Sequence, residues 1–175
     1  MASWYGAPYH NRRAANGQLY DMNALTAAHR TLPLNSVVRV TNLTTGHKVL
    51  VRITDRGPFK EDRVIDLSAA AAKAVDVWRS GTAKVKLEVL ETPAPIDRGG
   101  KWAVQLGAFE RERDARKIQD TLSRRYRSAK VLAFSGPIGD WWVRVRVLND
   151  EKTRAEQVVH DSPAARELTF LVRLD

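Results

Sequence analysis

Apolar and polar residues alternate in several short segments of the chain up to residue 91, which is the pattern of strands with one buried face. In the last of these segments, Val85, Leu87 and Val89 alternate with charged neighbours. The alternation predicts strands at residues 3–5, 37–41, 49–54, 64–66 and 84–90. Ser68 is a suitable N-cap for one helix over residues 69–77. Many short strands with one helix indicate a small closed barrel.

The chain after residue 100 has a different pattern, with two longer helical segments between strands. Residues 110–126 place Ala115, Ile118 and Leu122 on one face, as an amphipathic helix does. The predicted order is a strand at 102–106, that helix, strands at 130–134 and 141–147, a helix at 151–160 and a strand at 170–174. This βαββαβ order predicts a ferredoxin-like α+β sandwich, with both helices on one face of an antiparallel sheet.

Residues 92–100 read Thr-Pro-Ala-Pro-Ile-Asp-Arg-Gly-Gly and follow neither pattern. Their prolines remove backbone donors and their glycines add conformational freedom. We therefore place a linker at 92–100, between a mainly β domain at 1–91 and an α+β domain at 101–175.

The predicted strand at 141–147 has two chemically different faces. One face is aliphatic and belongs under the helices: Val143, Val145 and Val147. The other face is expected to be exposed and carries Trp142, Arg144 and Arg146, with Gln105 of another strand beside them. An aromatic ring with guanidinium and amide donors suits a sugar, because the apolar face of the sugar stacks and its hydroxyls accept hydrogen bonds. A solvated face with one partly covered tryptophan is the alternative interpretation.

Composition narrows the functional classes. The 175 residues include 29 Lys+Arg and 20 Asp+Glu, and the net charge of +9 favours an anionic partner such as nucleic acid, phospholipid or a cell-wall polymer. The chain has no cysteine, and its four histidines lack metal-ligand spacing, so no metal or other cofactor is predicted. No apolar run is long enough for a transmembrane helix. Strand-like residues follow Met1 directly, so no signal peptide is predicted, and export would require a targeting segment upstream.

The segment Thr54-Asp55-Arg56-Gly57-Pro58-Phe59 places a carboxylate at the end of a predicted strand. The strand gives Asp55 a rigid base, and Arg56 and Arg63 are placed to hold an anionic or hydroxyl-rich ligand beside it. This layout suits proton transfer. The alternative is that Asp55 only caps the turn, because Asp before Gly-Pro is a common loop composition.

Five segments of the first domain carry a family resemblance: Ala-Ser-Trp-Tyr-Gly at 2–6, Ala-Asn-Gly-Gln-Leu-Tyr-Asp at 15–21, Met-Asn-Ala-Leu-Thr-Ala-Ala-His-Arg-Thr-Leu-Pro at 22–33, Val-Arg-Val-Thr-Asn-Leu at 38–43, and Asp-Arg-Gly-Pro-Phe with Arg-Val-Ile-Asp-Leu-Ser within 55–68. Together they closely resemble the rare lipoprotein A (RlpA) family. The resemblance implies a six-stranded double-psi β-barrel, a fold shared with expansins and some endoglucanases. Residues 101–175, which begin Lys-Trp-Ala-Val-Gln-Leu-Gly-Ala-Phe, resemble a SPOR domain, the module that in this family recognises glycan strands without peptides.

The resemblance implies a lytic transglycosylase, which cuts the MurNAc–GlcNAc β-1,4 bond of peptide-free peptidoglycan without water and leaves a 1,6-anhydro end. The catalytic positions of the family fall on Gln18, His29 and Asp55. We expect Asp55 to act as acid and base, kept neutral by burial or by the charge of Asp66. We expect His29, with a titration near neutral pH, to orient Asp55 or the sugar.

The expected substrate contacts are Asp66, Arg56, Gln105, Trp142 and Arg144. The family carries Glu where this chain has Gln18, and an amide cannot transfer a proton at neutral pH. Three explanations stay open: an engineered inactivation that traps bound glycan, a natural variant that relies on Asp55, or a member that binds without cutting.

The same resemblance implies a location and partners. We expect a monomer that binds peptide-free glycan strands in the periplasm or outer envelope, at the division septum. A segment outside this chain would supply any outer-membrane anchor. The main rival is a non-catalytic, expansin-like peptidoglycan-binding protein, which Gln18 favours. A nucleic-acid partner is not expected, because the third strand of the α+β domain lacks an RNA-recognition run and the barrel offers no basic stripe.

Overall fold

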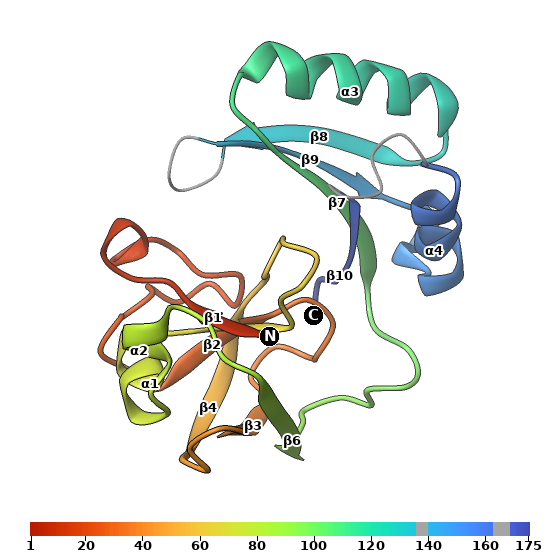
Figure 1. Cartoon of the computed structure of the whole chain (residues 1–175). Helices are drawn as coiled ribbons and strands as arrows, with labels where there is room; N and C mark the ends of the chain where they lie inside the picture. The colour runs from red at the N-terminus through yellow and green to blue at the C-terminus, as the bar shows by residue number, and fades with distance from the viewer. Residues whose placement is uncertain (136–139, 163–168) are drawn as a thin grey trace. The chain divides into compact units, whose positions relative to one another are not determined.

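The structure is a computed structural model that describes residues 1–135, 140–162 and 169–175. The chain divides into two compact units, Met1–Ile96 and Asp97–Asp175, and each is described by itself (Figure 1). The division falls within the stretch at 92–100 that the sequence predicts to be a linker. Within the described ranges, no helix is both long and apolar enough to cross a membrane.

The first unit is a six-stranded mixed sheet. Its strands are β1 (Ala2–Trp4), β2 (Thr26–His29), β3 (Val37–Asn42), β4 (Lys48–Asp55), β5 (Ile65–Leu67) and β6 (Val85–Glu91). They lie in the order β1-β5-β2-β4-β3-β6, with β1/β5 and β2/β4 parallel and the other pairs antiparallel. Ala2 and Ala83 exchange two backbone hydrogen bonds of 2.8 and 3.1 Å, which joins β1 to the residues before β6 and curls the sheet. The predicted six-stranded barrel is confirmed.

The core of this unit follows from the period-two pattern. On β3, Val38 and Val40 are fully buried between half-exposed neighbours. On β4, Val49 and Val51 are buried between exposed neighbours, and the buried pair Ile53 and Thr54 follows them. Branched side chains on alternate positions fill the inside of the curled sheet, and the polar positions face solvent. A short 3₁₀ helix, η1 (Ala7–Tyr9), follows β1.

Two elements of the first unit differ from the expectation. Strand β2 was not predicted, because Thr-Ala-Ala-His has neither clear alternation nor strong strand formers; its place between β4 and β5 is decided by long-range pairing. The single helix expected over 69–77 is two helices, α1 (Ala69–Ala74) and α2 (Val77–Ser80). The break lies at Asp76, whose φ of 59° is left-handed. Ser68 is the predicted N-cap, since its Oγ accepts a hydrogen bond from the Ala71 N–H at 3.1 Å.

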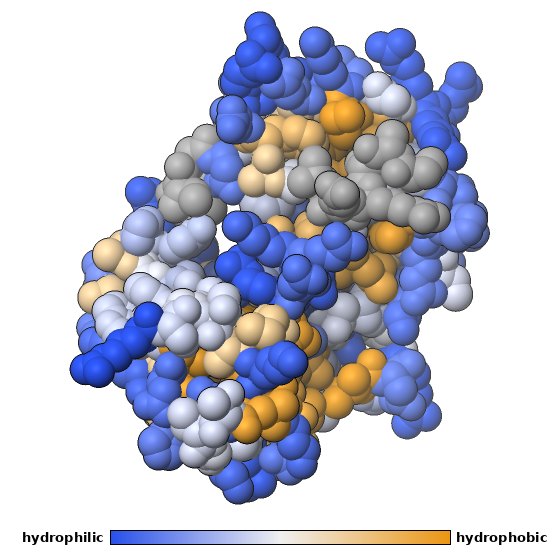
Figure 2. Space-filling view, in the orientation of Figure 1, coloured by the Kyte–Doolittle hydropathy of each residue, from blue (hydrophilic) through white to orange (hydrophobic). Residues whose placement is uncertain are grey.

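The second unit has the predicted βαββαβ order. It consists of β7 (Trp102–Phe109), α3 (Glu112–Arg125), β8 (Lys130–Ser135), β9 (Trp141–Arg146), a 3₁₀ turn η2 (Leu148–Asp150), α4 (Lys152–His160) and β10 (Thr169–Arg173). The strands form an antiparallel sheet in the order β10-β7-β9-β8. Helix α3 packs on β8 and β9, and α4 packs on β7 and β10. The outward side of α3 is hydrophilic (Figure 2), while Ala115 and Leu122 face the sheet. The ferredoxin-like sandwich is confirmed.

Candidate active site

The first unit brings two carboxyl groups to one face of its sheet. Asp55 ends β4, and Asp66 is the middle residue of β5. Each is paired in register with Ala28 of β2, the strand between them. Residues paired across neighbouring strands point to the same side, and two strand spacings put the backbones of Asp55 and Asp66 roughly 10 Å apart. The residue between them is the buried Ala28. Burial first, and then nearby charges that include Asp55 and Asp66, raise the pKa of the Tyr5 hydroxyl, which therefore lies near both carboxyl groups.

Asp55 is held by one of its two carboxyl oxygens. Its Oδ1 accepts hydrogen bonds from the backbone N–H groups of Ala15, at 3.0 Å, and Arg56, at 2.8 Å. Within the described residues, no hydrogen bond is formed to Oδ2. Burial raises the pKa of Asp55, and the two N–H groups and the Arg56 charge oppose this shift in part. Asp55 therefore has one oxygen fixed and one free for a ligand, with its neutral form favoured by burial and not by the charge of Asp66.

Gln18 lies in a turn that docks on the end of β4. Ala14 donates to the Gln18 carbonyl at 2.8 Å, and Asn16 donates to the Thr54 carbonyl at 3.1 Å. This turn also carries the Ala15 N–H that binds Asp55, so Gln18 and Asp55 belong to the same end of the barrel. The exposed Gln18 side chain accepts a hydrogen bond from Asn16 Nδ2 at 2.9 Å. A carboxylate at position 18 would accept the same bond.

His29 corrects one expectation. Its Nδ1 accepts hydrogen bonds from the backbone N–H groups of Thr31, at 3.2 Å, and Leu32, at 3.0 Å. Burial first, and then the charges of Arg56 and Arg30, lower the pKa of His29 to about 4. The imidazole is thus neutral at pH 7, with its remaining proton on Nε2. The expected titration near neutral pH is wrong, because a buried ring that already accepts two N–H bonds resists a further proton.

Arg56 also holds the turn at residues 29–32, through its side chain. Its Nη1 donates to the carbonyls of His29, at 2.9 Å, and Leu32, at 2.7 Å. His29 and Arg56 therefore clamp residues 29–32 together, next to the backbone N–H that holds Asp55. This nitrogen of Arg56 is committed to the main chain, so the structure gives Arg56 a positioning role in addition to the substrate contact that the sequence predicts.

Asp66 is the second carboxyl group on this face, and it is paired with Arg63. Arg63 Nη2 lies 3.3 Å from Oδ2, and the Asp66 side chain is 14% exposed. Its other oxygen, Oδ1, is buried and has no hydrogen-bond partner among the residues of ranges 1–135, 140–162 and 169–175. Burial raises the pKa of Asp66 to about 6, against the lowering effect of Arg63 and Lys60. An unsatisfied buried carboxyl oxygen is costly, and it marks a place where a ligand can supply a donor.

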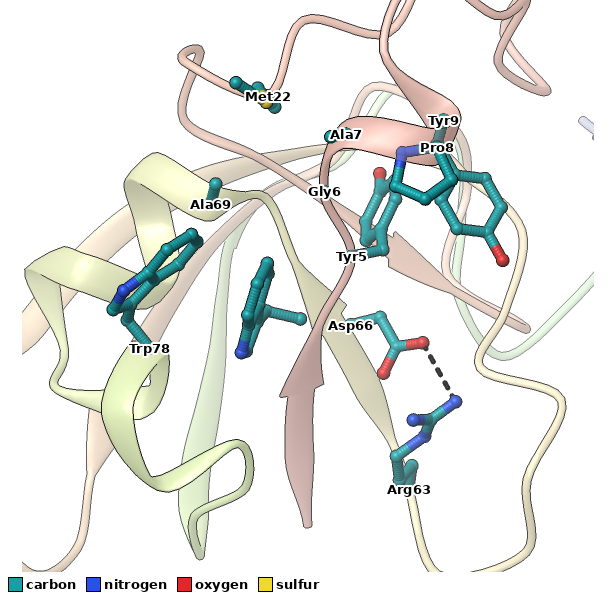
Figure 3. Close-up of a pocket in the computed structure, with 11 residues that line it drawn as sticks. Tyr5, Gly6, Ala7, Pro8, Tyr9, Met22, Arg63, Asp66, Ala69 and Trp78 are labelled. Atoms are coloured by element: carbon teal, nitrogen blue, oxygen red, sulfur yellow. Dashed lines mark ion pairs between the residues drawn. The ribbon is translucent and has the colours of Figure 1, made fainter. Parts of the chain in front are cut away.

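An aromatic cavity of about 500 Å³ opens beside Asp66. Figure 3 shows Trp78 on one side of it and Tyr5, Pro8 and Tyr9 on the other, with the Asp66 carboxyl directed at Arg63. The indoles of Trp4 and Trp78 have centroids 4.1 Å apart. Sequence reasoning missed this cavity. The available signal was the pair of adjacent aromatics, Trp4 and Tyr5, but only the fold brings Trp78 from α2 against them.

The second unit arranges its predicted contacts on the side of the sheet opposite the helices. Arg144 pairs in register with Gln105, and Trp142 with Gly107. Gln105 Oε1 accepts from Arg144 Nη2 at 2.6 Å and from Nε at 3.2 Å. A Cβ at Gly107 would lie 2.7 Å from the Trp142 ring, so glycine is needed there.

One expectation on this sheet needs correction. Gln105 has the predicted neighbours, but it is 3% exposed and so is not an exposed donor. Its side chain instead orients Arg144, whose guanidinium also lies 5.1 Å from the Phe134 ring. Arg144 and Trp142 are half-buried on this face.

Comparison with known proteins gives consistent matches. Residues 1–87 match a family model described as lytic transglycolase, and residues 98–159 match the SPOR domain. The chain is 40% identical over 168 residues to the endolytic peptidoglycan transglycosylase RlpA of Neisseria meningitidis serogroup A, covering 95% of this chain and 65% of that protein. It is 41% identical over 142 residues to the RlpA of Campylobacter jejuni, covering 67% and 52%.

A solved structure of a mutant Clavibacter michiganensis expansin in complex with cellohexaose matches with a TM-score of 0.43 and 15% identity, over 84% of this chain and 78% of that one. The chain spans between half and two thirds of the length of the two RlpA proteins named above.

Proposed function

The chain belongs to the RlpA family of endolytic peptidoglycan transglycosylases, and on that premise we propose that it cleaves the MurNAc–GlcNAc β-1,4 bonds of peptide-free glycan strands to give 1,6-anhydro ends. The proposal is supported above all by Asp55. It is a carboxyl group with one oxygen fixed by two backbone N–H groups, the other oxygen free, and a pKa raised by burial. A general acid must be oriented toward the atom that it protonates, and it must hold a proton at the working pH. The two N–H groups orient the Asp55 carboxyl, and its raised pKa favours retention of the proton.

The reaction requires one proton to leave the enzyme and one to return. Asp55 Oδ2–H protonates the glycosidic oxygen, the bond from C1 of the MurNAc ring to that oxygen breaks, and positive charge develops at C1. The C6 hydroxyl of the same ring then attacks C1 and gives its proton back to Asp55. No water and no second acid is consumed, because the nucleophile is part of the substrate. Oδ1 keeps its two N–H bonds throughout, so the carboxyl does not rotate between the two steps.

The neighbouring groups support this cycle without entering it. Asp66, ionised above pH 6, places a negative charge on the same face as the developing cation. His29 stays neutral and, with Arg56, fixes the turn beside Asp55. Gln18 lies on the turn that supplies the Ala15 N–H. Its amide stands where an acidic side chain would assist proton transfer by Asp55.

The second unit supplies retention on the substrate in this proposal. Trp142 and Arg144 offer a ring and guanidinium donors to glycan strands, and Gln105 keeps Arg144 in place. Such binding would hold the barrel on peptide-free strands in the cell envelope, in the periplasm at the division septum. The protein acts there as a monomer.

The test is the rate at which anhydro ends form from peptide-free sacculi, measured by mass spectrometry of the digests. Asp55→Asn keeps the two hydrogen bonds to Oδ1 but carries no transferable proton, so we expect a loss of about 10²- to 10⁴-fold. Asp62→Asn, a change at an exposed carboxylate, is the matched control and should have no effect. Full activity of Asp55→Asn would remove Asp55 from the mechanism.

The second candidate function is an expansin-like protein that binds peptidoglycan without cutting it. The amide at Gln18 favours this candidate, because it cannot transfer a proton. The two functions differ in their products. Retention on glycan with no anhydro ends, both in the chain as it stands and in Gln18→Glu, would establish the binding function instead.

A further inference from the structure

The cavity beside Asp66 is not used by the proton transfer described above. It is lined by four aromatic side chains, Trp4, Tyr5, Tyr9 and Trp78, and by the Arg63–Asp66 pair. Trp78 is 38% exposed although it is a large apolar residue. Aromatic walls with a few convergent polar groups are typical of a ligand site.

The indoles in this cavity are held in position. Trp78 stacks on Trp4 with a centroid distance of 4.1 Å and an interplanar angle of 31°. Lys73 Nζ lies 4.6 Å from the centroid of the Trp78 ring. At Gly6, a Cβ would lie 2.8 Å from Trp4 Cζ3, so the absence of a side chain at position 6 leaves room for the Trp4 ring. A ligand that stacks here meets rings that are already ordered, which reduces the entropy lost on binding.

Asp66 connects this cavity to the active site. The residue lines the cavity and is also in register with Ala28, on the face that carries Asp55. Among the residues that the structure describes, its buried Oδ1 has no hydrogen-bond partner, so a donor on a ligand in the cavity would satisfy it. Asp66 is therefore shared by the cavity and by the face that carries Asp55.

We propose that the Trp4–Trp78 cavity is a glycan subsite that binds an N-acetylhexosamine ring neighbouring the scissile bond, with a sugar hydroxyl or acetamide N–H donating to Asp66 Oδ1. A pyranose ring has an apolar C–H face for the aromatic walls and polar donors at its rim. A proline-rich peptide would also suit aromatic walls, but proline has no backbone N–H and would leave Asp66 Oδ1 unsatisfied. This inference rests on the proposed function, because it takes the glycan strand as the ligand of the Asp55–Asp66 face.

The experiment measures binding and not cleavage, so that failure of the subsite and failure of the enzyme can be told apart. The probe is chitotetraose, whose rings lack the lactyl group of MurNAc. The full chain is labelled with ¹⁵N at its five tryptophans, and the indole N–H signals are assigned with single Trp→Phe variants. We expect chitotetraose to shift the Trp4 and Trp78 signals, and the signal of Trp102, which is 3% exposed, to stay in place.

Two variants make the test quantitative. Trp78→Ala removes an exposed wall and should weaken the affinity reported by the Trp4 signal roughly tenfold, whereas Trp78→Phe should keep most of it. Gly6→Ala removes no side chain but displaces the Trp4 ring, and should weaken binding as well. Leu43→Ala, in the exposed turn after β3, is the control and should bind as the parent does.

The opposing outcomes are distinct. Unshifted Trp4 and Trp78 signals at saturating chitotetraose would overturn the subsite, even if Asp55 proves essential for cleavage. Shifts caused by a proline-rich decapeptide and not by chitotetraose would assign the cavity to a peptide. If Trp78→Ala retains the parent affinity while the Trp4 signal shifts, the platform does not include Trp78 and the proposal is wrong as stated.

Discussion

Burial of titratable groups has different consequences in the two units. On the barrel face, burial raises the pKa of both Asp55 and Asp66, which favours the protonated form of each carboxyl group, and Asp55 transfers its proton in the proposed reaction. On the sheet of the second unit, burial and the Arg146 charge lower the pKa of Arg144, whose partner is the neutral Gln105. Arg144 remains charged, since a guanidinium does not lose its proton in proteins. The arrangement in the first unit therefore suits proton transfer, and the arrangement in the second unit suits retention of an anionic or hydroxyl-rich polymer.

The largest expected effect concerns the proton chemistry of the barrel. Gln18→Glu keeps the bond from Asn16 Nδ2 and adds a group that can carry a proton at the same end as Asp55. We expect formation of anhydro ends to rise on the order of 10²- to 10⁴-fold, as measured by mass spectrometry of digested peptide-free sacculi.

Ser123→Glu, at an exposed position of α3, is the control for added charge and should not change the rate. An unchanged rate in Gln18→Glu would mean that Asp55 works without a partner acid at position 18.

The next effect is a pH dependence of stability. Asp66 has a pKa raised from 3.8 to about 6, so the folded state holds this proton more tightly than the unfolded state, and stability falls as pH rises from 4 to 6. His29 has a pKa lowered from 6.5 to about 4, so the unfolded state binds the proton more readily, and stability falls as pH drops from 6.5 to 4. The two contributions therefore oppose each other between pH 4 and 6.

Single variants separate these contributions, each worth about 2 to 3 kcal/mol across its window. Asp66→Asn should leave a steeper loss of stability on acidification, and His29→Gln should leave a loss on raising the pH. Urea unfolding at half-unit steps from pH 4 to 8 measures both slopes. If both variants keep the pH profile of the parent, burial does not shift the pKa values of Asp66 and His29 enough to change the stability with pH.

The smallest effect concerns the second unit. Arg144→Ala removes the donors held by Gln105 and should weaken retention on peptide-free glycan roughly tenfold in a pull-down, with the rate of the barrel on soluble strands unchanged. Arg124→Ala, on the exposed side of α3, is the matched control. Thermal unfolding of Arg144→Ala is needed beside it, because Gln105 loses its partner. Equal retention by both variants would place the glycan contact elsewhere.

The local pattern of apolar and polar residues was sufficient to predict a strand or helix wherever one face of that element is buried. The alternation on β3, β4 and β9 and the helical period of α3 predicted these elements, because the side chains themselves sort to core or solvent. Strand β2 was not predictable in this way. Its alanines have weak strand preference, and they form a strand because β4 and β5 pair with them on both sides.

The candidate site divides in the same manner. Asp55 was predicted from its place at a strand end, while Gln18 and His29 came from the resemblance to a family. The chemical state of each group could not be predicted from the sequence. The neutral state of His29 depends on the backbone N–H groups of residues 31 and 32. The burial of Gln105 depends on its neighbours in the sheet. The Trp4–Trp78 contact joins residues 74 positions apart, which no local pattern reports.

Side-chain period and composition were enough to predict the two units and most of their strands and helices. Three features follow only from the folded chain: which oxygen of Asp55 accepts the two backbone N–H groups, which imidazole nitrogen of His29 accepts hydrogen bonds, and that Asp66 lines an aromatic cavity. Hydrogen bonding and desolvation depend on neighbours distant in the chain, and these neighbours meet only when the sheet curls.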